Sequence, residues 1–130
     1  MGSSIRLAKV LRAVRGVGPV VAATLIADLL ELGRLSGKQI AALVGLAPHT
    51  HESGKRIRQA KTGHGRPLVR SALFNAARAA IRHPSTMRDF YNRIAHDNKR
   101  PGKVALTAVM RKILVIANAR DHLNAQHQTA

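Results

Sequence analysis

Hydrophobic residues recur every three or four positions along most of the chain, which is the spacing of an amphipathic α-helix. Residues 5–14 place Ile5, Ala8 and Leu11 on one face, and residues 19–32 form a strongly apolar stretch that we expect to be a buried helix. No segment shows the strict alternation of a half-buried strand. The pattern therefore predicts an all-α fold, a compact bundle of five or six helices.

A further helix is expected to begin near Pro67, because proline favours the first helical turn. Its apolar residues recur at helical spacing and define a buried face that leaves Arg70 and Arg78 outside. The residues of this face are Val69, Leu73, Ala76, Ala77 and Ala80. A last long helix is expected from about Val104 to Leu123. Its apolar face carries Leu106, Val109, Ile113 and Ile116.

Two serines stand where helix N-caps are expected, since a serine side chain accepts a hydrogen bond from the first free backbone N–H groups. Ser36 precedes the apolar segment 38–46, and Ser85 precedes a short helix. The apolar side of that short helix carries Met87, Phe90, Tyr91 and Ile94.

The length of 130 residues suits one domain with a single modest core. We assign residues 5–124 to this helical domain. The opening residues 1–4, MGSS, are typical of an expression-vector remnant, and residues 125–130 are expected to form a flexible tail.

The charge of the chain indicates its kind of partner. There are 22 Lys and Arg against 6 Asp and Glu, a net charge of +16, which points to nucleic acid. A membrane partner is disfavoured because no apolar run approaches the ~20 residues of a spanning helix. Aromatic residues are few, so backbone phosphate contacts are favoured over base stacking. The absence of cysteine suits a cytoplasmic protein.

The most polar segment is residues 47–65, which we expect to be a long basic loop. Its cations are Lys55, Arg56, Arg58 and Lys61, and Arg66 follows directly. Loops this long in a compact domain tend to be functional or disordered. Guanidinium groups match the geometry of phosphate oxygens. We therefore expect these five cations, together with Arg70 on the next helix, to contact DNA.

The segment VRGVGPVV supplies a second candidate contact with DNA. Gly16 and Gly18 lie two apart before Pro19, and the helix that follows offers free N–H groups to a phosphate. This arrangement is typical of a helix-hairpin-helix, a DNA-binding unit without sequence preference. A plain glycine turn between two packed helices explains the residues equally well, and both interpretations stay open.

Metal chemistry finds little support in the residues themselves. His49, His51 and His64 lie in the basic segment without cysteine or enough carboxylates for a zinc site. The acids are scattered, whereas a two-metal nuclease needs several carboxylates around ions about 4 Å apart. We expect no metal cofactor in this chain.

Ser53, followed by Gly54, stands in the middle of the basic loop. Serine attacks a phosphodiester only when its hydroxyl is activated and the developing charge is stabilised, and the neighbouring arginines are suited to the second task. Ser-Gly is also ordinary turn composition. From the residues alone, the turn is the favoured interpretation.

The combination of motifs changes this balance. The stretches VRGVGPVVAATLIADL, LVGLAPHTHESGKRIRQAKTGHGRPLVRSALFNAA and PGKVALTAVMRKILVIANA lie in that order. Together they closely resemble the C-terminal domain of insertion-sequence transposases of the IS-one-ten type. That family includes Piv-like DNA invertases and bridge-RNA-guided recombinases. The resemblance covers about residues 9–120.

The resemblance implies a function for Ser53. In the family, the serine of an A-P-x-x-x-x-S-G motif is thought to attack DNA and form a phosphoserine link. Four acids of an N-terminal RuvC-like domain bind metal, so Mg²⁺ is expected in that domain, which this chain lacks. The G-G-R that usually precedes the next helix stands here as Gly63, His64, Gly65 and Arg66, and this departure leaves the roles of the arginines open.

We therefore expect the DNA-binding, serine-bearing domain of a transposase or recombinase, inactive as an isolated fragment. Its partners are expected to be DNA, a second copy of the full protein and, in guided members, a bridge RNA, in the prokaryotic cytoplasm. One alternative is a non-catalytic helix-hairpin-helix protein that only holds nucleic acid. Another is an assembly module whose apolar helices join protomers.

Overall fold

The protein is described by a computed structural model that covers residues 2–47 and 66–129, with side chains for residues 6–47 and 66–123. These residues form six α-helices and one short π-helix, which are joined by turns, and no strand occurs among them. The α-helices are α1 (Gly2–Arg12), α2 (Pro19–Asp28), α3 (Gly37–Val44), α5 (Pro67–Ala80), α6 (Thr86–Asn92) and α7 (Gly102–Thr129). The all-α prediction is confirmed.

The helix bounds differ most from the predicted ones in α1, α2 and α7. α1 begins at Gly2, inside the opening segment that was assigned to a vector remnant. α2 ends at Asp28 instead of residue 32. α7 continues to Thr129, past the predicted end near Leu123.

The early end of α2 has a tertiary cause. Leu29 and Leu32 are both buried, so they contribute to the core from a turn instead of a helix. The turn is held by Asn118 of α7, whose Oδ1 accepts a hydrogen bond from Gly33 N at 2.6 Å and whose Nδ2 donates to Leu35 O at 2.9 Å. Asn118 is 5% exposed and is the one polar residue in the buried set of the described side chains. Both of its hydrogen-bonding groups are satisfied, as burial requires.

The predicted N-caps of α3 and α6 are confirmed. The Ser36 side chain accepts from Gln39 N at 3.1 Å while Gln39 Oε1 accepts from Ser36 N at 2.9 Å, which is a capping box. Ser85 accepts from Arg88 N at 3.1 Å. At the other end of α3, Gly45 has a φ of 84° and ends the helix, because glycine adopts the left-handed conformation without strain.

The predicted face of α5 is also confirmed. Its five apolar residues, listed above from Val69 to Ala80, are at most 1% exposed. Arg78 is exposed, and its guanidinium lies 5.7 Å from the centre of the Phe74 ring. Arg70 is partly exposed. The small alanines of this face let α5 approach its neighbours closely.

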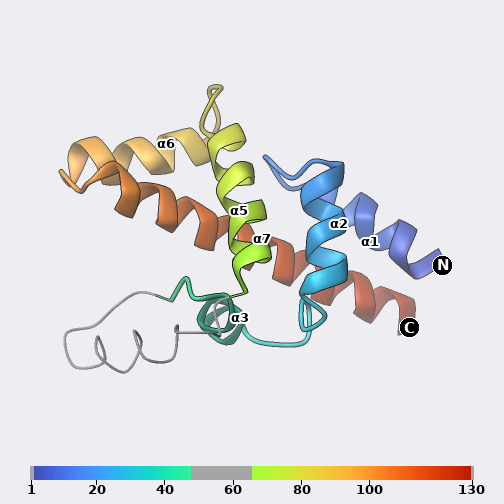
Figure 1. Cartoon of the computed structure of the whole chain (residues 1–130). Helices are drawn as coiled ribbons and strands as arrows, with labels where there is room; N and C mark the ends of the chain where they lie inside the picture. The colour runs from blue at the N-terminus through green and yellow to red at the C-terminus, as the bar shows by residue number, and fades with distance from the viewer. Residues whose placement is uncertain (1, 48–65, 130) are drawn as a thin grey trace.

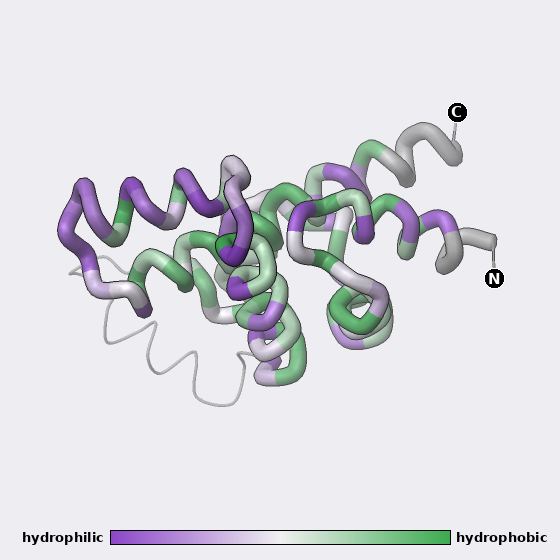
Figure 2. Tube along the Cα trace, turned by 90° about the horizontal axis from the view of Figure 1, so that it is seen from above, coloured by the Kyte–Doolittle hydropathy of each residue, from purple (hydrophilic) through white to green (hydrophobic). Residues whose placement is uncertain are grey.

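α7 is the central element of the bundle (Figure 1). It packs against α5, α1, α3 and α6, while α5 also packs against α2. Leu73 of α5 and Val109, Ile113 and Leu114 of α7 are fully buried in the core. Truncating such residues to alanine costs about 2–5 kcal/mol in comparable cores. Figure 2 shows hydrophobic residues where α5 and α7 meet and mostly hydrophilic residues along α6.

The π-helix, η1 (Arg93–Asp97), continues α6 and leads into the turn before α7. In that turn Lys99 has a φ of 52°, and Arg100 N donates to Ile94 O at 3.1 Å. Short π-helical stretches occur often at functional sites. Here the stretch positions Asn98 and Arg100 beside the first turns of α7. None of the helices described for this chain is both long enough and apolar enough to cross a bilayer.

Candidate nucleic-acid interface

Most of the predicted serine site lies outside the described residues. This holds for Ser53 and for Lys55, Arg56, Arg58 and Lys61, so their roles stay predictions. The structure does describe the two residues that flank this segment, Ala47 and Arg66. It also describes Gly16, Gly18 and Arg70.

The glycine turn before α2 packs against α5. Gly16 has a φ of 89°, and a Cβ at this position would lie 2.3 Å from the backbone oxygen of Ala76. Gly18 has a φ of −90°, an extended conformation open to any residue, and no atom lies within 4 Å of its virtual Cβ. A positive φ therefore occurs at Gly16 and not at Gly18. Gly16 is required for close packing, and contact of either glycine with DNA stays a prediction.

Arg66 is held by an acid of the same chain. Its Nη1 and Nη2 each lie 2.5 Å from a carboxylate oxygen of Glu31, and Nη1 also donates to Asp28 O at 3.3 Å. The hydrogen bonds from Arg66 lower the pKa of Glu31, and the same bonds raise the pKa of Arg66. This guanidinium, predicted to clamp phosphate, is occupied by a carboxylate, and its role toward DNA stays a prediction.

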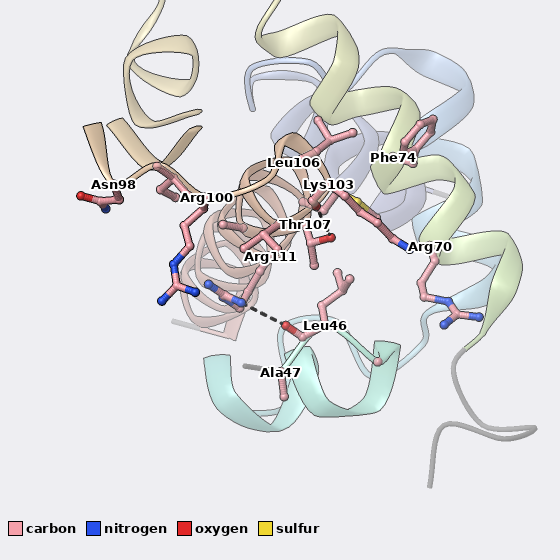
Figure 3. A pocket seen from close by; sticks show the side chains of 15 residues that line it. Leu46, Ala47, Arg70, Phe74, Asn98, Arg100, Lys103, Leu106, Thr107 and Arg111 are labelled. Atoms are coloured by element: carbon pink, nitrogen blue, oxygen red, sulfur yellow. Dashed lines mark hydrogen bonds between the residues drawn. The ribbon is translucent and has the colours of Figure 1, made fainter. Parts of the chain in front are cut away.

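A groove of about 980 Å³ opens between the end of α3, the first half of α5 and the start of α7 (Figure 3). Four cations line it: Arg70, Arg100, Lys103 and Arg111. No Asp or Glu is among its lining residues in the described part of the chain. Ala47, which immediately precedes the segment 48–65, lines the groove as well, and Arg70 lies one helical turn after Arg66.

The cations come from different parts of the fold. Figure 3 shows Arg70 on α5, Lys103 and Arg111 on α7, and Arg100 in the turn before α7. Arg111 Nη1 donates to Leu46 O at 3.3 Å, which ties α7 to the end of α3. Arg111 therefore has donors left for a ligand, because a guanidinium carries five N–H groups.

Sequence reasoning found Arg70 and missed the other three cations. A signal was available, because Lys103, Thr107 and Arg111 are spaced four apart and so share one face of α7. The structure brings all three to the groove. The hydroxyl of Thr107 donates to Lys103 O at 2.9 Å and leaves its oxygen able to accept.

The described acids do not assemble a metal site. No three His, Asp or Glu side chains gather there in a way that could hold an ion. Glu31 is paired with Arg66, and Asp121 lies on α7 beside the Gly33 turn, where burial raises the pKa of its carboxyl. These residues do not fit the carboxylate set that Mg²⁺ requires.

The fold and the groove define a basic helical domain that is suited to a phosphate-rich partner. The model of the Transposase IS116/IS110/IS902 family matches residues 8–92, and the chain belongs to this family. A protein of Pseudomonas aeruginosa named "Probable family 20 transposase" is 30% identical over 106 residues. The match covers 78% of this chain and 31% of the relative, so the chain spans about a third of that protein's length. No solved structure matches the chain.

Proposed function

We propose that this chain is the DNA-binding, serine-bearing domain of a transposase that cuts and rejoins DNA. The observation that carries the proposal is the groove, whose lining in the described part of the chain has four cations and no acid. The groove lies near the two described residues that flank the segment containing Ser53, since Ala47 lines it and Arg66 lies one turn before the lining residue Arg70. Membership of a transposase family supports the same conclusion.

The groove cations supply the affinity in this account. Arginine forms charge-assisted, often bidentate hydrogen bonds to phosphate oxygens. Each neutralised phosphate releases counterions from the DNA, so binding strengthens as the salt concentration falls. Backbone contacts of this kind carry little information on base sequence. The isolated domain should therefore bind duplex DNA with weak sequence preference.

Ser53 supplies the chemistry. Its Oγ attacks a backbone phosphorus, a bond forms between Oγ and phosphorus, and one bond from phosphorus to a deoxyribose oxygen breaks. The proton lost from Ser53 balances the proton that the departing oxygen gains. Reversal of the step with a different strand end rejoins the DNA. Lys55, Arg56 and Arg58 follow within five residues and would stabilise the charge on the phosphate oxygens.

The proposal extends to parts of the protein outside this chain. We place the Mg²⁺-binding carboxylates in an N-terminal RuvC-like domain, where the ion would polarise the phosphate. A second copy of the full protein would cut and rejoin the second DNA strand. In guided members of the family, a bridge RNA would be a further partner. In this proposal, the DNA is cut and rejoined in the prokaryotic cytoplasm.

The test traps the covalent intermediate in the protein that carries both domains. A radiolabelled DNA substrate should become attached to the wild type, and peptide mapping should find the label on Ser53. Ser53→Ala should lose the adduct and strand exchange while its DNA affinity changes by less than about fivefold, because one hydroxyl contributes about 1 kcal/mol or less to binding.

Ser71→Ala is the matched control, since Ser71 is an exposed serine on α5 outside the groove. It should keep both adduct and exchange. An adduct that persists in Ser53→Ala, or exchange at the wild-type rate, would reduce Ser53 to an ordinary turn residue.

A further inference from the structure

The groove has an apolar part, here called its floor, in addition to the four cations, here called its rim. The floor consists of the lining residues Phe74, Ile94, Val104 and Leu106. Phe74 and Leu106 are labelled in Figure 3. Phe74 is 40% exposed and Val104 is 48% exposed, so two sizeable hydrophobic side chains meet water there. Phosphate contact explains the four cations but leaves this floor without a function.

An unpaired nucleotide matches both features. Its phosphate carries the charge that the rim attracts, and the face of its base is a flat surface that packs on aliphatic and aromatic side chains. The polar edge of a base would find the amide of Asn98 and the oxygen of Thr107, which also line the groove. A volume of about 980 Å³ is at the upper end of the roughly 300–1,000 Å³ of pockets for drug-sized ligands, a size that includes a nucleotide.

A protein occupant from the same chain is disfavoured by charge. A second copy brings another +16, with 22 basic against 6 acidic residues, toward a rim that is itself cationic. A stacked duplex accounts for the four cations but not for the apolar residues, because its base faces are covered by their neighbours and only edges and phosphates are presented. An extruded base in DNA combines negative charge with a free apolar face.

We propose that the groove binds an unpaired nucleotide of DNA, with its base on the Phe74 and Val104 floor and its phosphate on the cationic rim. The proposal rests on DNA binding by this domain. It adds that the preferred DNA is locally unstacked at the bound site. The sequence favoured phosphate contacts over stacking because aromatics are scarce, whereas the structure places one of them, Phe74, on the groove.

The test compares two DNA duplexes with the same single-nucleotide bulge. One bulge carries adenine and the other carries an abasic sugar, so both probes have the same number of phosphates. Fluorescence anisotropy should show the 130-residue chain binding the adenine probe at least about fivefold more tightly, as expected for one base stacked on protein. Phe74→Ala and Val104→Ser should each bring this ratio toward one.

Val20→Ser is the matched control, because Val20 is 79% exposed on α2 and does not line the groove. It should keep the wild-type ratio. Equal affinity of the wild type for both bulges would overturn the inference while leaving DNA binding intact. Failure to bind either probe would instead overturn the proposed function.

Two further outcomes would also overturn the inference. A larger base-dependent ratio in the equivalent RNA probes than in DNA would assign the groove to RNA. An unchanged ratio in both Phe74→Ala and Val104→Ser would mean that the base does not rest on these two side chains.

Discussion

The glycine turn, which packs against Ala76 of α5, and the groove, which is lined by Arg70 and Phe74 of α5, are both candidates for contact with DNA. At the turn, Gly16 presses against the backbone of Ala76 and its conformation is fixed by that packing. At the groove, Arg70 and three other cations line an open surface, and no acid is among the lining residues that the structure describes. The conformation of the turn is fixed by packing inside the protein, whereas we propose that the groove binds a partner. A sequence motif alone does not separate these two situations.

The largest expected effect is on the turn. Gly16→Val should lower the free energy of unfolding by about 3 kcal/mol or more, because it combines a strained φ with a clash against α5. Gly18→Val should change it by less than about 1 kcal/mol, since the position is extended and open. Chemical denaturation of both variants measures the difference. Equal destabilisation by Gly16→Val and Gly18→Val would contradict the close packing of Gly16 against α5.

The next effect separates two arginines that lie four residues apart. Arg70→Gln should weaken duplex DNA binding by roughly tenfold, because a free guanidinium is lost from the groove. Arg66→Gln should weaken it by less than about threefold, because the Arg66 charge is already neutralised by Glu31. Electrophoretic mobility shift assays would measure the duplex affinity of both variants. A larger loss in Arg66→Gln would mean that DNA displaces Glu31.

The smallest expected effect is the pH dependence of the Glu31–Arg66 pair. The lowered pKa of Glu31 means that the pair stabilises the fold above the unfolded pKa of the carboxyl and that this stability is lost as pH falls through the folded pKa. Both side chains are about a third exposed, so the amount should stay below about 1 kcal/mol. Urea denaturation at pH 7 and pH 3 should show that the wild type has a higher free energy of unfolding than Glu31→Gln at pH 7 and that this difference becomes smaller at pH 3. A difference that becomes larger at pH 3 would contradict the lowered pKa of Glu31.

Local signals predicted much of the fold. Ser36 and Gln39 form the capping box, Pro67 begins α5, and the periodicity after it identified the buried face. The end of α2 was missed because Leu29 and Leu32 continue a helical pattern. The turn that interrupts it is fixed by Asn118, which lies 85 residues from Gly33. A partner so distant leaves no local signal.

The site was predictable only in part for the same reason. Arg66 counted as a free cation because Glu31, 35 residues earlier, gave no local sign of pairing with it. Arg100 reaches the groove only because η1 and the left-handed Lys99 turn the chain back beside α7. The net charge predicts the kind of partner, and the tertiary structure decides which cations are available to it.

The central claim is that the groove is the surface that binds DNA. The most direct test measures duplex affinity over a range of salt concentrations for two triple variants that remove equal charge. One changes Arg70, Lys103 and Arg111 in the groove to Gln, and the other changes the exposed Arg6, Lys9 and Arg12 of α1. Each phosphate contact contributes about 0.9 to the slope of log K against log salt. The groove variant should have a slope smaller in magnitude by up to about three times this amount, while the slope of the α1 variant stays close to that of the wild type. Equal slopes for the two variants would contradict the claim.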